Sequence, residues 1–197
     1  EIYRCELEAA LRKLSQARPR MRSHTRSISA PVFRVIQDQD WTADWREAVP
    51  VLHLGHQIVV RPSWQSYCAE DGEIVLEMDP GAAFGTGMHP TTQLCIEIVE
   101  RWLQPDMRVL DLGTGTGILA LTAAKLGAAS VLAIDCDPNA VAIAQHNVEI
   151  NDVARIVHPC QGALSDVRGT YDIVLVNILA STVIQMLEAG LMSHIRH

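Results

Sequence analysis

The stretch Asp111-Leu-Gly-Thr-Gly-Thr-Gly117, with a later acid at Asp135, decides the fold predicted for this chain. Two apolar residues, Val109 and Leu110, lead into the glycines, and apolar residues at helical spacing follow them. The glycines allow a tight turn and a close backbone approach to a ligand, because no Cβ stands in the way. The pattern predicts a buried strand, a glycine-rich turn and a helix, which together form a unit of an α/β fold.

Asp135 follows a second apolar run, residues 131–134, which predicts the next buried strand. Open α/β sheets bind their ligands at the carboxyl ends of the strands. A carboxylate at that edge can accept hydrogen bonds from both hydroxyls of a ribose. The spacing therefore predicts a ligand that contains a nucleoside.

The glycine spacing excludes two common nucleotide motifs. The dinucleotide fingerprint needs glycine at its first, third and sixth positions, and the sixth position counted from Gly113 is Ile118. A phosphate-binding loop needs Gly-Lys followed by Ser or Thr, which this sequence lacks. The Gly-x-Gly-x-Gly run after Asp111 instead resembles the first motif of S-adenosylmethionine-dependent methyltransferases. From the residues alone, a tight turn in another doubly wound domain stays open.

Two further segments accompany this motif, namely Asp79-Pro-Gly-Ala-Ala-Phe-Gly-Thr-Gly-Met-His-Pro-Thr-Thr92 and Tyr171-Asp-Ile-Val-Leu-Val-Asn-Ile-Leu-Ala180. In this order the three motifs closely resemble the bacterial ribosomal protein methyltransferase family that modifies protein eleven of the large subunit. The resemblance covers about residues 41–180. Most methyltransferases acting on amide or base nitrogens carry Asn-Pro-Pro-Tyr/Phe after the fourth strand. This chain has Asn177-Ile-Leu-Ala180, as the ribosomal protein family does.

The resemblance implies a class I enzyme that transfers methyl groups from S-adenosylmethionine to lysine side chains or the α-amine of a large-subunit ribosomal protein. It implies that Thr92, Gly113, Asp135 and Asn177 contact the cofactor. We add Asp111 and Gly115, from the same glycine-rich motif, to the predicted cofactor-binding residues. The acid that contacts adenine in many methyltransferases is not evident after the third strand.

Asn177 is also the predicted catalytic residue. It follows the apolar strand 173–176, which places it at the carboxyl edge of the sheet. Its amide can accept a hydrogen bond from a neutral amine, and it does not trap the amine as an ammonium as a carboxylate would. The alternative is that Asn177 caps the following helix.

The loop Phe84-Gly-Thr-Gly-Met-His89 carries two glycines around Thr86. We expect it to wrap the cofactor, with Thr86 and Phe84 as cofactor contacts and Phe84 as an apolar or cation-facing wall. A simple turn is the alternative. On the first turn of the next helix, Thr91 or Thr92 could reach the carboxylate of the cofactor, and the resemblance favours Thr92.

The resemblance divides the chain into three segments. Residues 1–30 would be the remnant of a small N-terminal α+β substrate-recognition domain with its linker, residues 31–78 a connecting β-rich segment, and residues 79–197 the methyltransferase domain. We expect a doubly wound, Rossmann-like sheet that stops after its fourth strand, because the last three of the family's seven strands have no sequence here. That departure puts the stability and activity of the chain on its own in doubt.

The remaining patterns predict the other elements. Strands are expected at 31–36, 51–54, 57–61, 73–78, 154–159 and 171–176. Helices are expected at 6–17 and 41–48, after His89-Pro90, after Asp137-Pro138 to about 150, and from about Ser181. For the helix after Pro90, the predicted buried face is Leu94, Cys95, Ile98, Trp102 and Leu103.

Composition narrows the class of protein. Hydrophobic residues make up 48% of the chain and charged residues 20%, which is typical of a globular α/β protein. The net charge is −7, yet residues 1–26 carry +4, which leaves −11 on the rest. The basic segment could help to dock a ribosomal component, or it could be a solvated helix followed by a linker. The five cysteines form no CxxC pair and indicate buried thiols in a reducing cytoplasm.

Other functions stay open at this level. The chain could be a methyltransferase of the same fold that acts on RNA or a small molecule, or a non-catalytic cofactor-binding fragment. Asn177-Ile-Leu-Ala180 favours a protein substrate, and no aromatic and basic stacking surface argues for RNA. We therefore expect a ribosomal protein as partner, a cytoplasmic location, and neither direct nucleic-acid binding nor a metal site. No apolar run is long enough to span a membrane, and no signal peptide is evident.

Overall fold

A computed structural model describes residues 49–79, 81 and 85–196. All described elements belong to one compact unit of the chain, Ala48–His197. The helices predicted at 6–17 and 41–48, the strand predicted at 31–36 and the side chain of Phe84 lie outside the described residues. These expectations and the proposed domain boundaries stay predictions.

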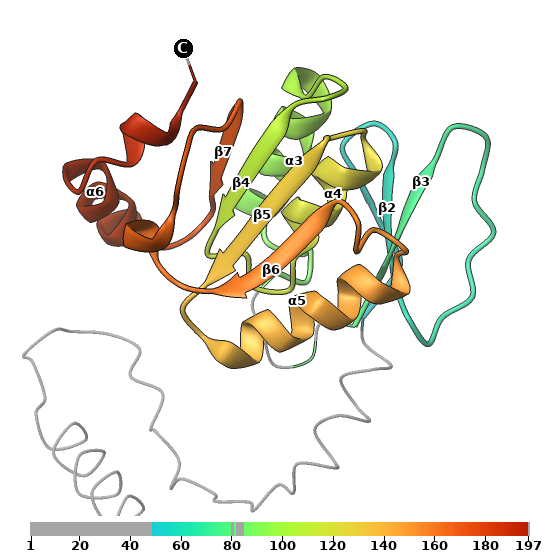
Figure 1. Ribbon diagram of the computed structural model, residues 1–197. Helices are drawn as coiled ribbons and strands as arrows, with labels where there is room; N and C mark the ends of the chain where they lie inside the picture. Colours follow the sequence, from blue (N-terminus) through green and yellow to red (C-terminus); the bar gives the residue numbers. More distant parts are fainter. Residues whose placement is uncertain (1–48, 80, 82–84, 197) are drawn as a thin grey trace, which may run out of the picture. The chain divides into compact units, whose positions relative to one another are not determined.

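The main sheet has four parallel strands in the order β6-β5-β4-β7 (Figure 1). Their bounds are β4 Arg108–Leu112, β5 Ser130–Asp135, β6 Val157–Gln161 and β7 Ile173–Val176. The strand order reverses next to β4, because β5 and β6 follow on one side of it and β7 lies on the other. This arrangement confirms the predicted doubly wound α/β fold. It also creates a crevice at the carboxyl ends of β4 and β7, where such folds bind ligands.

Alternating side chains of these strands bury both faces of the sheet. On β4, Val109 belongs to one apolar cluster and Leu110 to a second; on β5, Val131 and Ile134 are divided in the same way. Helix α4 (Ile118–Lys125) contributes to the first cluster. The second cluster includes residues of the short helices η1 (Leu164–Asp166) and η2 (Leu191–His194), with α6 (Ala180–Glu188) packed against it through Met186.

A second, smaller sheet has the order β1-β2-β3. Strand β1 (Leu52–Leu54) is antiparallel to β2 (Ile58–Pro62), and β2 is parallel to β3 (Ile74–Met78). Its apolar residues share the first cluster with α4, so the two sheets have a common core. Helix α3 (Pro90–Trp102) is tied to this sheet by Glu100, which accepts hydrogen bonds from the backbone N–H of His56 at 2.7 Å and of Gln57 at 2.9 Å.

Helices α3 and α5 begin where the sequence predicted them. His89 is the N-cap residue of α3 and Asp137 that of α5 (Pro138–Ile150), and each is followed by proline. The Asp137 carboxylate accepts from the backbone N–H of Asn139 at 2.9 Å and so caps α5, which confirms the helix start predicted after Asp137-Pro138. In the described part of the chain, no helix has the length and apolar character needed to cross a membrane.

The predicted buried face of α3 is wrong in part. Leu94, Ile98 and Trp102 are 56%, 54% and 63% exposed, whereas Ile96 and Val99 are buried. Cys95 and Leu103 do pack against the core, as predicted. The helix carries apolar residues on two faces, and helical periodicity alone does not say which face meets the sheet.

Two strands of the main sheet differ from the prediction by more than one residue at an end. The third strand of the main sheet is Val157–Gln161 and not 154–159, because the chain is still turning after α5, with Asp152 at a φ of +58°. The fourth is Ile173–Val176 and not 171–176, since Tyr171 forms an isolated parallel bridge with Ile195 instead.

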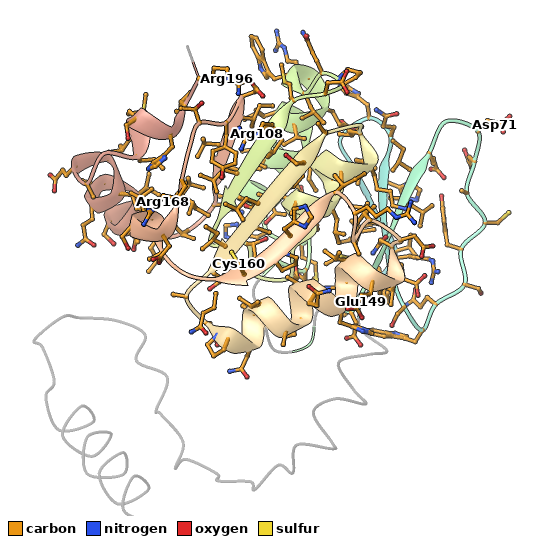
Figure 2. All side chains as sticks on the ribbon, viewed as in Figure 1. Asp71, Arg108, Glu149, Cys160, Arg168 and Arg196 are labelled. Atoms are coloured by element: carbon orange, nitrogen blue, oxygen red, sulfur yellow. The ribbon has the colours of Figure 1, made fainter. Side chains whose placement is uncertain are left out.

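The amino-terminal edge of the main sheet carries a charged contact. The carboxylate of Asp172 accepts from the backbone N–H of Arg108 and from the guanidinium of Arg196, both at 2.8 Å. Figure 2 shows Arg108 and Arg196 at this same end of the sheet. Asp135 stands at the carboxyl end of β5, so Asp172 and Asp135 are at opposite edges.

Candidate functional site

A cavity of about 530 Å³ lies at the carboxyl edge of the main sheet. Four of the predicted site residues line it: Gly113, Gly115, Asp135 and Asn177. They come from three different segments, namely the turn after β4, the end of β5 and the end of β7. The structure therefore brings together residues that are up to 64 positions apart in the sequence, at the crevice that the strand order predicts.

Asp135 is held by two backbone donors. Its Oδ2 accepts from the N–H of Gly115 at 2.9 Å, and its Oδ1 accepts from the N–H of Asp137 at 3.0 Å. An ionised carboxylate can accept about four hydrogen bonds, so both oxygens keep capacity for further donors. The carboxylate is thus fixed in orientation and remains able to bind a pair of hydroxyl groups at the cavity wall.

Gly113 needs to be glycine for two reasons. Its φ is +76°, which L side chains rarely adopt, and a Cβ at this position would overlap the Cγ2 of Ile178. The backbone N–H groups of Gly113 and Thr114 both donate to the carbonyl of Ile134, at 2.8 Å and 3.0 Å. The turn is therefore anchored to the end of β5, and its backbone forms part of the cavity wall.

Asp111 lies beneath the turn and does not line the cavity. Its side chain is 1% exposed, and its Oδ2 accepts from the hydroxyl of Thr114 at 2.7 Å. The pKa of Asp111 is raised to about 6, chiefly by burial; hydrogen bonds from Thr114 and the Ala120 backbone oppose the rise, and the nearby charge of Asp135 adds a small part to it. In this position Asp111 supports the glycine-rich turn, and its predicted cofactor contact stays a prediction.

Asn177 lines the cavity, and a hydrogen bond to the buried Thr92 fixes the orientation of its amide. Its Nδ2 donates to Thr92 Oγ1 across 3.2 Å, and Thr92 is 1% exposed. The N-cap residue of α6 is Leu179, so the alternative that Asn177 caps this helix is wrong. The bond to Thr92 uses one of the two Nδ2 hydrogens, so Asn177 can still offer its amide oxygen as an acceptor, and its second N–H as a donor, to a ligand or an acceptor amine.

The start of α3 contributes its N-cap residue His89 and Thr91 of its first turn to the cavity wall. The two side chains are joined, with His89 Nδ1 and Thr91 Oγ1 2.8 Å apart. Thr86 does not line the cavity, and its hydroxyl oxygen accepts from the N–H of Met88 at 3.4 Å. The predicted roles of Thr86 and Phe84 as cofactor contacts therefore stay predictions.

Sequence reasoning missed part of the lining. His89 was predicted only as the last residue of the loop expected to wrap the cofactor and Asp137 only as the residue before a helix, and Ala140, Ile178 and Leu179 were not singled out. The available signal was position, because each adjoins a predicted motif residue or begins a helix at the same edge. Among the described residues, no group of three His, Cys, Asp or Glu side chains could hold a metal ion.

Comparison with known proteins supplies the family. The family model for ribosomal protein L11 methyltransferase (PrmA) matches residues 5–195. The chain is 43% identical over 169 residues to the ribosomal protein L11 methyltransferase of Geotalea uraniireducens, covering 79% of this chain and 53% of that protein. It is 48% identical over 158 residues to the one of Desulforamulus reducens, covering 79% and 51%. The chain thus spans about half the length of these relatives.

A solved structure supports the same family assignment. The ribosomal protein L11 methylase of Lactobacillus delbrueckii subsp. bulgaricus superimposes with a TM-score of 0.67 at 36% identity, covering 74% of this chain and 75% of that chain. The family match extends over nearly all of the sequence, and the solved relative has the same fold. This chain therefore belongs to the ribosomal protein L11 methyltransferase family.

Proposed function

We propose that this chain binds S-adenosylmethionine in the cavity at the carboxyl edge of its main sheet, and that the protein methylates amino groups of a large-subunit ribosomal protein. The Asp135 carboxylate carries the proposal, because two backbone N–H groups orient it at the cavity wall. Family membership supports the same reading, since relatives of about twice this length are named ribosomal protein L11 methyltransferases. A ribosomal substrate goes with a cytoplasmic location.

The residues at the cavity fit this cofactor. A ribose needs an acceptor for its two hydroxyls, which Asp135 supplies. A close approach of the ligand to the backbone needs a wall without side chains, which Gly113 and Gly115 supply. Ala140 and Ile178 give apolar surface beside these polar groups.

Methyl transfer mainly requires that the enzyme position the methyl donor and the acceptor amine. S-adenosylmethionine supplies a methyl group on a sulfonium, which an amine displaces in line. Holding reactants in a near-attack arrangement can remove about 7–11 kcal/mol of the barrier. In this proposal, the amide oxygen of Asn177 accepts a hydrogen bond from the neutral amine, while Thr92 keeps the amide from rotating.

Calorimetry tests the cofactor. We expect S-adenosylhomocysteine, the demethylated product, to bind to the purified chain, and we expect NAD not to bind, because Ile118 occupies the position where a dinucleotide turn needs glycine. Binding of NAD without binding of S-adenosylhomocysteine would refute the proposed cofactor.

Labelling tests the substrate. The protein is incubated with methyl-labelled S-adenosylmethionine and separated large-subunit proteins, and the labelled band is identified. Label in one ribosomal protein, on its lysine side chains or α-amine, is the expected result. Label in ribosomal RNA would support the alternative of an RNA methyltransferase, and binding without any transfer would support a non-catalytic cofactor-binding chain.

A further inference from the structure

Asn147, on the buried side of α5, joins two segments that border the cavity. It is 0% exposed, and its Oδ1 accepts from the N–H of Asp79 at 2.8 Å. Its Nδ2 donates to the carbonyl of Asp79 at 3.1 Å and to the carbonyl of Thr116 at 2.9 Å. One side chain thus connects the end of the small sheet with the glycine-rich turn.

Asn151, the C-cap residue of α5 and one helical turn after Asn147, makes the same kind of contact. Its Oδ1 accepts from the N–H of Glu77 at 3.0 Å, and its Nδ2 donates to the carbonyl of Glu77 at 2.6 Å. Glu77 and Asp79 are alternate residues of an extended segment, so their N–H and C=O groups point to the same side. The two asparagines therefore satisfy the edge of this segment much as a neighbouring strand would.

A second connection runs from Thr116 to Gly85. The hydroxyl of Thr116, which is 0% exposed, donates to the carbonyl of Gly85 at 2.7 Å. Gly85 has a φ of +115°, and a Cβ there would lie 2.5 Å from Thr116 Oγ1. The close approach of the two segments thus depends on glycine at 85 and on a hydroxyl at 116.

These contacts hold a segment that forms part of the cavity wall. It is bonded at Asp79 by Asn147, at Gly85 by Thr116, and at Thr92 by Asn177. Between the last two points it places His89 and Thr91 in the cavity lining. None of the three bonds is needed for the strands to pair, since all three lie outside the ladders of the main sheet.

We propose that Thr116 and Asn147 are positioning residues, which hold Asp79 and residues 85–91 against the glycine-rich turn and so set the shape of the cofactor cavity. The inference rests on the proposed function for the identity of the ligand. Without these bonds, residues 85–91 adopt the conformation that binds the ligand in only a fraction of the molecules. The apparent dissociation constant then rises by the inverse of that fraction.

The chain offers a matched control. Thr122 is also 0% exposed, and its hydroxyl also donates to a backbone carbonyl, that of Ile118 at 2.8 Å. That bond lies within α4 and does not reach the cavity wall. Thr116→Val and Thr122→Val remove one buried hydroxyl each with little change in shape, whereas Thr116→Ser keeps the hydroxyl at 116.

The experiment measures binding of S-adenosylhomocysteine by calorimetry and unfolding by urea for the wild type and the three variants. We expect Thr116→Val to weaken binding by about tenfold or more, and Thr116→Ser and Thr122→Val to stay within about threefold of the wild type. A Thr116→Val variant that binds like the wild type overturns the proposal. So does a Thr122→Val variant that loses binding as strongly, because the effect would then follow from lost stability alone.

Hydrogen exchange separates this inference from the proposed function. We expect Thr116→Val to speed amide exchange in residues 85–91 relative to the wild type, and Thr122→Val to leave that segment unchanged. If the wild type does not bind S-adenosylhomocysteine, the cofactor assignment fails, yet faster exchange at 85–91 still supports the anchoring role. Unchanged exchange there in Thr116→Val overturns it. Asn147→Ala, measured in the same way, is expected to loosen the segment near Asp79 as well.

Discussion

Asn177 Nδ2 donates to Thr92 Oγ1 across 3.2 Å and thereby joins the end of β7 to the first turn of α3. The resemblance implied that both residues contact the cofactor. In the structure only Asn177 lines the cavity, and Thr92 is buried behind it. Their roles can therefore differ, since Asn177 can meet a ligand or an amine while Thr92 fixes the orientation of the amide.

Asn177→Ala should slow methyl transfer far more than it weakens cofactor binding. If the amide holds the acceptor amine in the transition state, its loss lowers kcat and kcat/KM together, by about 10²–10³-fold. Steady-state kinetics of the active protein with the ribosomal substrate, beside calorimetry with S-adenosylhomocysteine, give the two numbers. An equal loss in both would mean that Asn177 only binds the cofactor.

Thr92→Val should reproduce part of the Asn177→Ala defect. The variant keeps the shape of the buried side chain but removes the acceptor of the amide N–H. Because the two residues act as a unit, the double variant should be little worse than Asn177→Ala alone. Strictly additive losses in kcat would show that Thr92 acts independently, for example by a cofactor contact of its own.

Asp135→Ala should weaken binding of S-adenosylhomocysteine by about 1–3 kcal/mol, because hydroxyls of the ligand would lose their acceptor in a partly buried site. Asp172→Asn is a suitable control, since Asp172 also accepts from a backbone N–H next to a strand end, but at the opposite edge of the sheet. Calorimetry should show unchanged affinity for Asp172→Asn. If the folded Asp135→Ala variant binds S-adenosylhomocysteine as tightly as the wild type, Asp135 stabilises the glycine-rich turn and does not bind the ligand.

Asp111 should make stability fall as pH rises. Its pKa is about 6 in the folded chain, chiefly because of burial, against about 3.9 for an unfolded aspartate. The folded state therefore binds the proton more tightly, and this contribution is complete below the unfolded pKa and is lost as pH rises through the folded pKa. Relative to Asp111→Asn, the wild type should lose about 1–2 kcal/mol between about pH 5 and pH 7.5. Urea unfolding of both proteins at the two pH values measures the difference, and identical pH dependence would contradict it.

Site residues were predictable where one short stretch of sequence indicates both the local backbone structure and the functional group placed there. Gly113 and Asp135 stand in such segments, because a glycine-rich turn and an acid after an apolar run locate two strand ends by themselves. Asn147 and Thr116 could not be found in this way. Their function lies in bonds to Asp79 and Gly85, 68 and 31 positions away, and nothing local distinguishes them from a solvated asparagine or a turn threonine.

Helix α3 shows the same limit in its packing. Its apolar residues form two stripes, and the sequence favoured the one with the larger side chains, including Trp102. The structure buries Thr92, Ile96 and Val99 instead of Leu94, Ile98 and Trp102. In this orientation the hydroxyl of Thr92 reaches Asn177, and the carboxylate of Glu100 reaches the turn after β1. These long-range polar contacts favour the observed orientation, and periodicity along the helix carries no information about them.

Two isoleucines of α3 test this orientation directly. Ile96 is 0% exposed and Ile98 is 54% exposed, although the sequence pattern predicted burial of Ile98. Ile96→Ala should lower the free energy of unfolding by about 2–5 kcal/mol, because it removes buried methyl groups and leaves a cavity beside the core. Ile98→Ala should cost under about 1 kcal/mol, since the side chain is largely in water and alanine favours the helix. Urea unfolding of the two variants in one buffer gives the comparison. A larger loss for Ile98→Ala would mean that α3 is rotated from the orientation described here, and the bond between Thr92 and Asn177 would then be lost as well.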